Sequence, residues 1–211
     1  QPAGELFATL NEEQRAAACA QERAVAVIAG PGTGKTQTLI ARIIHLVERQ
    51  KARPDTITAV TFTNQAAQEM RARLEAQLGG KQAIRGMTIG TFHSICLQLL
   101  QQQSGTVTLI DPDEALALAH EIVRALGLSL SPAQLLEGIS RHKNELPCTD
   151  VPPQALALYA RRLEQRHALD FDDLLLRALA LDMPEQKPAF THLLVDEFQD
   201  INALQHRLIR A

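Results

Sequence analysis

The feature that most constrains the fold is a glycine-rich segment that lies between an apolar run and a helical pattern. The apolar run, Ala24–Ala29, is continuous, which is typical of a strand buried on both faces in a parallel sheet. After the glycines, apolar residues recur at helical spacing, so we expect a helix over residues 35–50. The segment itself is Ala29-Gly30-Pro31-Gly32-Thr33-Gly34-Lys35-Thr36, which differs from G-x-x-x-x-G-K-[ST] only in its first residue.

This segment has the composition of a loop that binds phosphate. Glycines let the backbone wrap with its N–H groups toward an anion, and the start of the following helix adds partial positive charge. In such a loop Lys35 reaches the β- and γ-phosphates and the Thr36 hydroxyl binds Mg²⁺. The alternative is a glycine-rich turn that happens to precede Lys-Thr, but the position between a strand and a helix favours the phosphate site.

A second segment near the end of the chain carries the complementary acidic groups. The apolar strand pattern Leu193–Val195 runs directly into Asp196 and Glu197. Asp196 is expected to hold Mg²⁺, mostly through water, and Glu197 to orient or deprotonate an attacking water. An acidic strand end is common by itself. Together with the loop at Lys35, however, the pair indicates a P-loop nucleotide hydrolase.

Strand and helix patterns alternate in the first part of the chain, which predicts an α/β fold with a parallel sheet. The expected strands are Ile57–Phe62, Met87–Phe92 and His192–Val195, and the expected helices include Glu12–Ala20, with Asn11 as its N-cap, and Ala66–Leu78. Between residues 94 and 167 the strand pattern stops, and helices are expected over 113–126, 132–143 and 153–167. We therefore predict an inserted all-helical subdomain at 94–167 and a main domain formed by 1–93 plus 168–211.

Further segments resemble motifs of the UvrD/Rep/PcrA-type superfamily 1 DNA helicases, in that family's order and over nearly the whole chain. Leu10–Gln14 resembles the Q motif, Thr61–Met70 motif Ia, Gly90–Ser94 motif Ib and Val195–Asp200 motif II. Leu169–Leu174, and Ile139-Ser140 with Lys143-Asn144, also resemble family segments. The resemblance implies a RecA-like domain similar to domain 1A of the family, with the insertion similar to domain 1B.

The resemblance also implies an activity. It implies an ATP-dependent motor in DNA repair that moves 3′ to 5′ on single-stranded DNA and unwinds duplex, with Mg²⁺ as cofactor. Its partners would be ATP, single-stranded DNA, single-strand/duplex junctions and a second RecA-like domain. In this comparison Gln14 matches the residue that recognises adenine. Its side-chain amide can hydrogen-bond to both a donor and an acceptor on the edge of the base. Gln199 matches the sensor of the γ-phosphate, and Lys35 and Glu197 the catalytic positions. Gln37 stands where the family usually has an arginine near the adenine.

Two aromatic residues at expected strand ends are candidates for contact with DNA. Phe62 and Phe92 each lie beside hydroxyl and amide groups, in a chain with six Phe, one Tyr and no Trp. Such rings can stack on the bases of single-stranded nucleic acid. Phe is usually a core residue, and composition alone favours burial, but the motif resemblance favours stacking for both rings. Side chains able to contact phosphate adjoin them, namely Thr63, Asn64, Thr91 and His93.

Two other charged groups have alternative roles. Asp170, Asp172 and Asp173 open a helix pattern, where carboxylates stabilise a helix start without any catalytic function. Lys143 is either a phosphate contact or a solvated surface lysine. The helix expected after Asp200, which carries Arg207 and Arg210, should pack on the sheet.

Charge, apolar runs and cysteine content narrow the classes of protein to which the chain can belong. The net charge of −3 does not by itself indicate nucleic acid, and no apolar run approaches the ~20 residues of a membrane span. The three cysteines form no C-x-x-C pair, which favours a reducing compartment, the cytoplasm. No counterpart of the family's motif III or of its arginine finger is found, so we expect these 211 residues alone to hydrolyse ATP poorly. The main alternative is an ATP- and DNA-binding module without productive hydrolysis. A P-loop kinase or GTPase explains neither the Gln14 motif nor Phe62 and Phe92.

Overall fold

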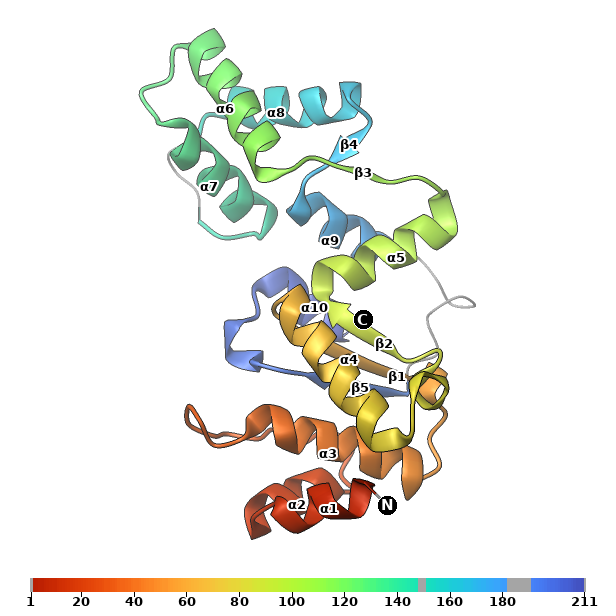
Figure 1. The fold of residues 1–211 in the computed structure, drawn as a ribbon. Coiled ribbons are helices and arrows are strands. Elements are labelled where there is room, and N and C mark those ends of the chain that lie inside the picture. Colours follow the sequence, from red (N-terminus) through yellow and green to blue (C-terminus); the bar gives the residue numbers. More distant parts are fainter. Residues whose placement is uncertain (1, 148–150, 182–190, 211) are drawn as a thin grey trace. The chain divides into compact units, whose positions relative to one another are not determined.

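A computed structural model describes residues 2–147, 151–181 and 191–210 of the chain (Figure 1). The described residues fall into two compact units. The first is drawn from Gln1–Ile95 and Met183–Asp200, and the second from Cys96–Asp182 and Ile201–Ala211. Each unit has a hydrophobic core of its own.

A three-stranded parallel sheet forms the centre of the first unit. β1 (Ile57–Thr61) lies between β2 (Thr88–Thr91) and β5 (His192–Val195), so the strand order is β2-β1-β5. Ala59 of β1 is in register with Ile89 on one side and Leu194 on the other. Every residue of β1 is buried, as expected for a central strand. The three strands expected from the sequence at these positions are confirmed, each to within a residue or so at its ends.

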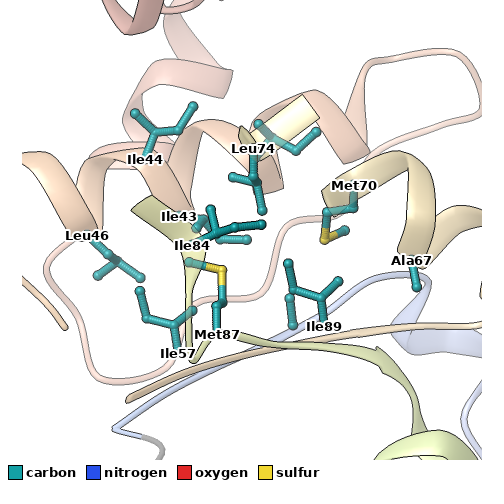
Figure 2. Close-up of a cluster of buried hydrophobic side chains, with 12 residues drawn as sticks. Ile43, Ile44, Leu46, Ile57, Ala67, Met70, Leu74, Ile84, Met87 and Ile89 are labelled. Atoms are coloured by element: carbon teal, nitrogen blue, oxygen red, sulfur yellow. The ribbon is translucent and has the colours of Figure 1, made fainter. Parts of the chain in front are cut away.

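Helices pack against this sheet and bury its core. α3 (Lys35–Glu48) and α4 (Asn64–Leu78) contact one another, and α4 contacts both β1 and β2. Figure 2 shows the resulting cluster, in which side chains of α3 and α4 meet residues of β1, of β2 and of the segment before β2. Its fully buried members include Ile43, Ile44, Leu46, Ile57, Met70 and Leu74. This core fixes the strands and the start of α3, and with them the loops at the carboxyl ends of the strands.

Two short helices precede the glycine-rich segment. α2 (Glu12–Cys19) begins after Asn11, whose side chain accepts a hydrogen bond from the Gln14 N–H, so the expected helix and its N-cap are confirmed. α1 (Pro2–Thr9) was not expected from the sequence. α1 and α2 both pack against α3.

The expected strand at residues 24–29 is absent, and this prediction is wrong for the structure as it stands. No secondary structure is assigned to these residues, and Ile28 is 99% exposed, with Val25 and Val27 about half exposed. The reason is that a strand needs a hydrogen-bonded neighbour, and among the described residues none pairs with this run. The apolar pattern of this run indicates that its side chains favour burial. It does not indicate whether another strand lies beside the run to pair with it.

The second unit is mainly helical. α5 (Phe92–Ser104) begins in the first unit and continues into the second, followed by α6 (Pro112–Leu126), α7 (Pro132–Lys143), α8 (Pro153–Gln165) and α9 (Phe171–Ala180). Asp111 and Ser131 form capping boxes at the starts of α6 and α7. The unit is not all-helical as expected, because β3 (Thr108–Leu109) and β4 (Ala168–Leu169) pair in parallel.

The last helix, α10 (Ala203–Arg210), packs on α9 and belongs to the second unit, whereas the sequence led us to expect it on the sheet of the main domain. Leu204 is buried, and the guanidinium of Arg207 lies 2.8 Å from a carboxylate oxygen of Glu145. None of the helices in the described part of the chain is both long and apolar enough to cross a membrane.

Candidate functional site

The glycine-rich segment forms the turn that its composition predicts. Gly32 and Gly34 have φ angles of 73° and 80°, in the left-handed region that glycine adopts without strain. The Thr33 hydroxyl donates to the carbonyl of Gly30 at 2.7 Å and closes the turn. Gly34 is the N-cap of α3, so the first backbone N–H groups of that helix lie beside Lys35 and Thr36.

The ammonium of Lys35 contacts the carboxylate of Glu197. The Lys35 Nζ atom lies 3.3 Å from Glu197 Oε2, and both side chains are partly exposed, at 28% and 37%. Glu197 follows β5 directly and has a φ of 49°, a conformation that is unfavourable for a residue other than glycine. Backbone strain of this kind is concentrated at functional sites.

The hydroxyl of Thr36 lies beside the other carboxylate. Its Oγ1 atom is 3.4 Å from Asp196 Oδ2, although the two residues are 160 positions apart in the sequence. The N–H of Asp196 donates to the carbonyl of Val60 at 2.9 Å, which anchors the end of β5 to β1. Both predicted magnesium ligands are therefore adjacent in space.

The two carboxylates have opposite pKa shifts. Burial raises the pKa of Asp196, opposed in part by hydrogen bonds from the Glu197 N–H and the Thr36 hydroxyl. The pKa of Glu197 is lowered, first by the hydrogen bond from Gln199 and then by the one from Lys35. The Gln199 Nε2 atom donates to Glu197 Oε2 at 2.5 Å. Gln199, matched to the γ-phosphate sensor, thus directly contacts the residue expected to activate water.

Gln14 is held against the glycine-rich segment. Its Nε2 atom donates to the carbonyl of Thr33 at 2.7 Å, and its Oε1 atom accepts the N–H of Asn11 at 2.9 Å. Gln37, in the first turn of α3, donates from Nε2 to the Thr9 hydroxyl at 2.9 Å. Thr9 was missed from the sequence because it ends the unexpected helix α1.

The candidate DNA contacts lie at one edge of the sheet. Thr61 and Thr91 end β1 and β2 in register, so the residues after them follow neighbouring parallel strands. Phe62 is 39% exposed, and Thr63 and Asn64 beside it are exposed as well. The Thr63 hydroxyl also accepts the N–H of Ala66 and caps α4. Phe62 is therefore accessible to a stacked base.

Phe92 differs from Phe62. It is the first residue of α5 and only 7% exposed, so its ring belongs to the core and cannot stack on a base in this structure. Thr91 and Ser94 cap the start of α5 through reciprocal hydrogen bonds of 2.9 and 3.2 Å, and His93 lies within that first turn. Gly90 allows this arrangement, because a Cβ there would lie 2.4 Å from Ser94 Oγ. Of the two aromatic candidates, only Phe62 keeps the geometry of a stacking platform.

Lys143 is not a solvated surface lysine. Its Nζ atom lies 2.6 Å from Asp170 Oδ2 and 2.8 Å from Asp173 Oδ1, with the Lys143 side chain only 13% exposed. Asp170 accepts the N–H of Asp173 and is the N-cap of α9, which confirms its expected capping role. Asn144 donates to Asp172 at 2.9 Å. These residues join the end of α7 to the start of α9, so the structure gives Lys143 a structural partner and leaves it unavailable to a phosphate.

Two comparisons with known proteins bear on this site. Residues 10–211 match the family model described as the UvrD/REP helicase N-terminal domain. The chain is 36% identical to the ATP-dependent DNA helicase UvrD1 of Mycobacterium tuberculosis over 243 residues, which cover 99% of the chain and 31% of that protein. It is 32% identical to the ATP-dependent DNA helicase PcrA of Staphylococcus epidermidis over 232 residues, 97% of the chain and 32% of that protein.

The structure brings the Lys35 ammonium and the Thr36 hydroxyl next to two carboxylates, beside a glycine-rich turn at the end of a parallel sheet. The chain belongs to the UvrD/REP helicase N-terminal domain family. It spans about a third of the length of the curated relatives that it matches.

Proposed function

We propose that the chain is the N-terminal motor portion of an ATP-dependent DNA helicase. One observation carries the proposal: the chain brings Lys35 and Thr36 to Glu197 and Asp196, across about 160 residues of sequence. The family membership and the names of the relatives support the same activity. The proposal includes a P-loop, RecA-like main domain of residues 1–93 plus 168–211, with an insertion at 94–167.

In this proposal the nucleotide phosphates lie at the start of α3. Gly32, Thr33 and Gly34 would present backbone N–H groups, and Lys35 would exchange its contact with Glu197 for the β- and γ-phosphates. Glu197 would then accept a proton from the attacking water, held in position by Gln199. A carboxylate whose pKa is lowered is ionised and able to act in this way near neutral pH.

Thr36 and Asp196 fit a magnesium ion. Both present oxygen atoms, the donor type that this hard cation prefers, and they lie close enough to share one site. The ion would neutralise phosphate charge when bound with ATP. The raised pKa of Asp196 fits a carboxylate that gains from a neighbouring cation.

Single-stranded DNA would cross the carboxyl ends of β1 and β2. Phe62 would stack on a base, and Thr63, Asn64, Thr91 and His93 would contact phosphates. By resemblance to the family, the motor would move 3′ to 5′ along single-stranded DNA and unwind duplex at single-strand/duplex junctions. It would act together with a second RecA-like domain, in the cytoplasm.

The direct test is the affinity for Mg·ATP of Lys35→Ala, measured by calorimetry or with a fluorescent analogue. The variant should lose binding, because the ammonium is the strong point charge beside the loop. Lys81→Ala, an exposed lysine outside the site, is the matched control and should bind as the parent does. Unchanged affinity in Lys35→Ala would refute the phosphate site.

A further inference from the structure

A group of exposed cations lies at the amino ends of the strands, the edge of the sheet away from the candidate phosphate site. Arg49, Lys51 and Arg53 belong to the segment that leads from α3 into β1, and Arg85 lies just before β2. Because β1 and β2 are parallel neighbours, their amino ends meet at one edge of the sheet (Figure 1). We call these four residues the amino-edge patch.

A close backbone contact joins the two segments that carry the patch. A Cβ placed on Gly86 would lie 3.1 Å from the Cβ of Asp55, and Gly86 has a φ of 89°, so glycine is required where the segments pass each other. Asp55 belongs to a short 3₁₀ helix, η1 (Pro54–Thr56), that leads into β1. The backbone at Arg85 therefore adjoins the segment that carries Arg53.

Few carboxylates offset the charge of the patch. In the described part of the chain, Arg53 is the one member with an ion-pair partner, and its Nε atom lies 3.3 Å from Asp55 Oδ1. This pair is 73% and 56% exposed, so its attraction is weak. Glu48 is the other carboxylate of the segment before β1, so two carboxylates accompany four cations. The patch is thus a local excess of positive charge on a chain whose net charge is −3.

Lys51 is held in a backbone conformation that favours glycine. Its φ of 57° lies in the left-handed region, which is unfavourable for a residue with a Cβ. The N–H of Ala52 donates to the carbonyl of Leu46 at 2.9 Å and turns the chain away from the end of α3. A lysine at a position where glycine is less strained indicates that its side chain serves a purpose other than stability.

The composition of the patch distinguishes two kinds of anionic partner. Surfaces that bind protein have an apolar centre, whereas surfaces that bind nucleic acid are more polar and strongly basic. None of the large apolar side chains exposed in the described part of the chain lies within residues 48–56 or 81–87. Three of the four cations are arginines, whose guanidinium groups bind phosphate through paired N–H groups. The patch therefore fits a phosphodiester backbone better than an acidic protein segment.

We infer that the amino-edge patch binds the phosphodiester backbone of nucleic acid, without regard to base sequence. This goes beyond the proposed function, in which DNA crosses the carboxyl ends of β1 and β2 beside Phe62. Because the two ends of a strand lie at opposite edges of a sheet, nucleic acid on the patch is a different segment from the one at Phe62. Contacts to phosphate add affinity and orientation but carry no sequence preference.

The test measures binding of a fluorescein-labelled duplex of about 20 base pairs, and of one of its single strands, by fluorescence anisotropy at several salt concentrations. The double variant Lys51→Gln, Arg85→Gln removes two cations that have no ion pair in the described part of the chain. It should bind about tenfold more weakly at about 50 mM salt. The slope of log K against log salt should fall by about 1 for each cation, since each phosphate contact releases counterions. The form of DNA with the larger loss is the one that the patch binds.

Two further variants separate binding from stability and from net charge. Lys51→Gly removes the charge and the unfavourable φ together, so it should weaken binding about threefold without lowering the melting temperature. The matched control is Arg124→Gln, Arg166→Gln, which removes two exposed cations from the second unit and should bind as the parent does.

Unchanged affinity and salt slope in Lys51→Gln, Arg85→Gln overturn the inference, as does a parent chain that binds neither form of DNA. An equal loss in the control would assign the effect to net charge and overturn it as well. A polyglutamate peptide that binds the parent more tightly than DNA, and the double variant less tightly, would identify an acidic protein partner instead. The proposed function is tested separately by the ATP affinity of Lys35→Ala and stands or falls independently.

Discussion

Lys35 Nζ lies 3.3 Å from Glu197 Oε2, so the cation expected to bind phosphate and the carboxylate expected to activate water are paired with each other. The pair spans two segments at opposite ends of the sequence and joins the start of α3 to the end of β5. A bound triphosphate would have to replace this contact. If the proposed function holds, the pair competes with the nucleotide, and its strength limits the affinity.

Glu197→Gln should bind ATP more tightly than the parent while losing hydrolysis. The charge that holds Lys35 is removed, so the ammonium no longer has to leave a carboxylate to bind phosphate. Because exposed ion pairs are weak, the gain in affinity should be no more than about fivefold. Hydrolysis should stop because glutamine cannot accept the proton of water. Titration with ATP and a phosphate-release assay measure the two effects. Weaker binding in Glu197→Gln would contradict the competition.

Phe62→Ala and Phe92→Ala should have different effects. Phe62 is exposed, and loss of its ring should weaken binding of single-stranded DNA by about 1–3 kcal/mol with little change in melting temperature. Phe92 is buried, and its truncation should lower the free energy of unfolding by about 3–5 kcal/mol. DNA titration by fluorescence anisotropy and denaturant unfolding separate the two. If Phe92→Ala lost DNA affinity without a loss of stability, Phe92 would be a DNA contact after all.

The stability of the first unit should rise as the pH increases from 5 to 7. Burial and the charges of Arg42 and Arg49 lower the pKa of His45, and burial and Arg42 lower the pKa of His192. The folded chain then binds fewer protons than the unfolded chain, so ΔG of unfolding increases with pH in this range. This contribution is fully present above the unfolded-state value of 6.5 and is lost as the pH falls through the folded-state values.

Urea unfolding at several pH values checks the histidine prediction. The double variant His45→Gln, His192→Gln should show a flatter dependence on pH than the parent. His120→Gln, a change at an exposed histidine of α6, is the control and should follow the parent curve. An equal slope in the double variant and the parent would assign the effect to other groups.

Lys143→Met should destabilise the second unit by about 3 kcal/mol, because Asp170 and Asp173 would keep their charges without a cation. Adding Asp173→Asn should recover part of that loss, since one uncompensated charge is removed. Denaturant unfolding of both variants measures the change, with exposed Lys81→Met as a control within about 0.5 kcal/mol of the parent. A loss no greater than the control's would show that the cluster is not stabilising.

Much of the sheet could be predicted from the sequence because its strands have strong local patterns. β1 and β5 are short, mainly apolar runs followed by polar residues, and α7 begins at a proline that follows a capping serine. The proximity of Thr36 to Asp196 could be predicted from the two motifs, because a phosphate-binding loop and an acidic strand end are expected to bind the same ligand. Each of these features depends either on local sequence or on two motifs that would bind one ligand.

Other features could not be predicted because they depend on partners far along the chain. Residues 24–29 have a strand pattern but no neighbouring strand, and Phe92 is buried through contacts that composition does not reveal. The contact of Gln37 with Thr9 depends on α1, a short helix whose apolar pattern covers only eight residues. The ion pairs of Lys143 with Asp170 and Asp173 could not be predicted, because the two aspartates lie 27 and 30 positions later in the sequence.

The exposed run Ala24–Ala29 has a consequence for the behaviour of the chain in solution. Six uncharged residues with two valines and one isoleucine form a segment of high β-propensity, and Ile28 is almost wholly in contact with water. Such segments associate with copies of themselves through backbone hydrogen bonds, particularly where a sheet such as β2-β1-β5 has edge strands that pair with no further strand in the described part of the chain. Self-association of the isolated 211 residues should therefore increase with concentration, and a lysine at position 28 should suppress it.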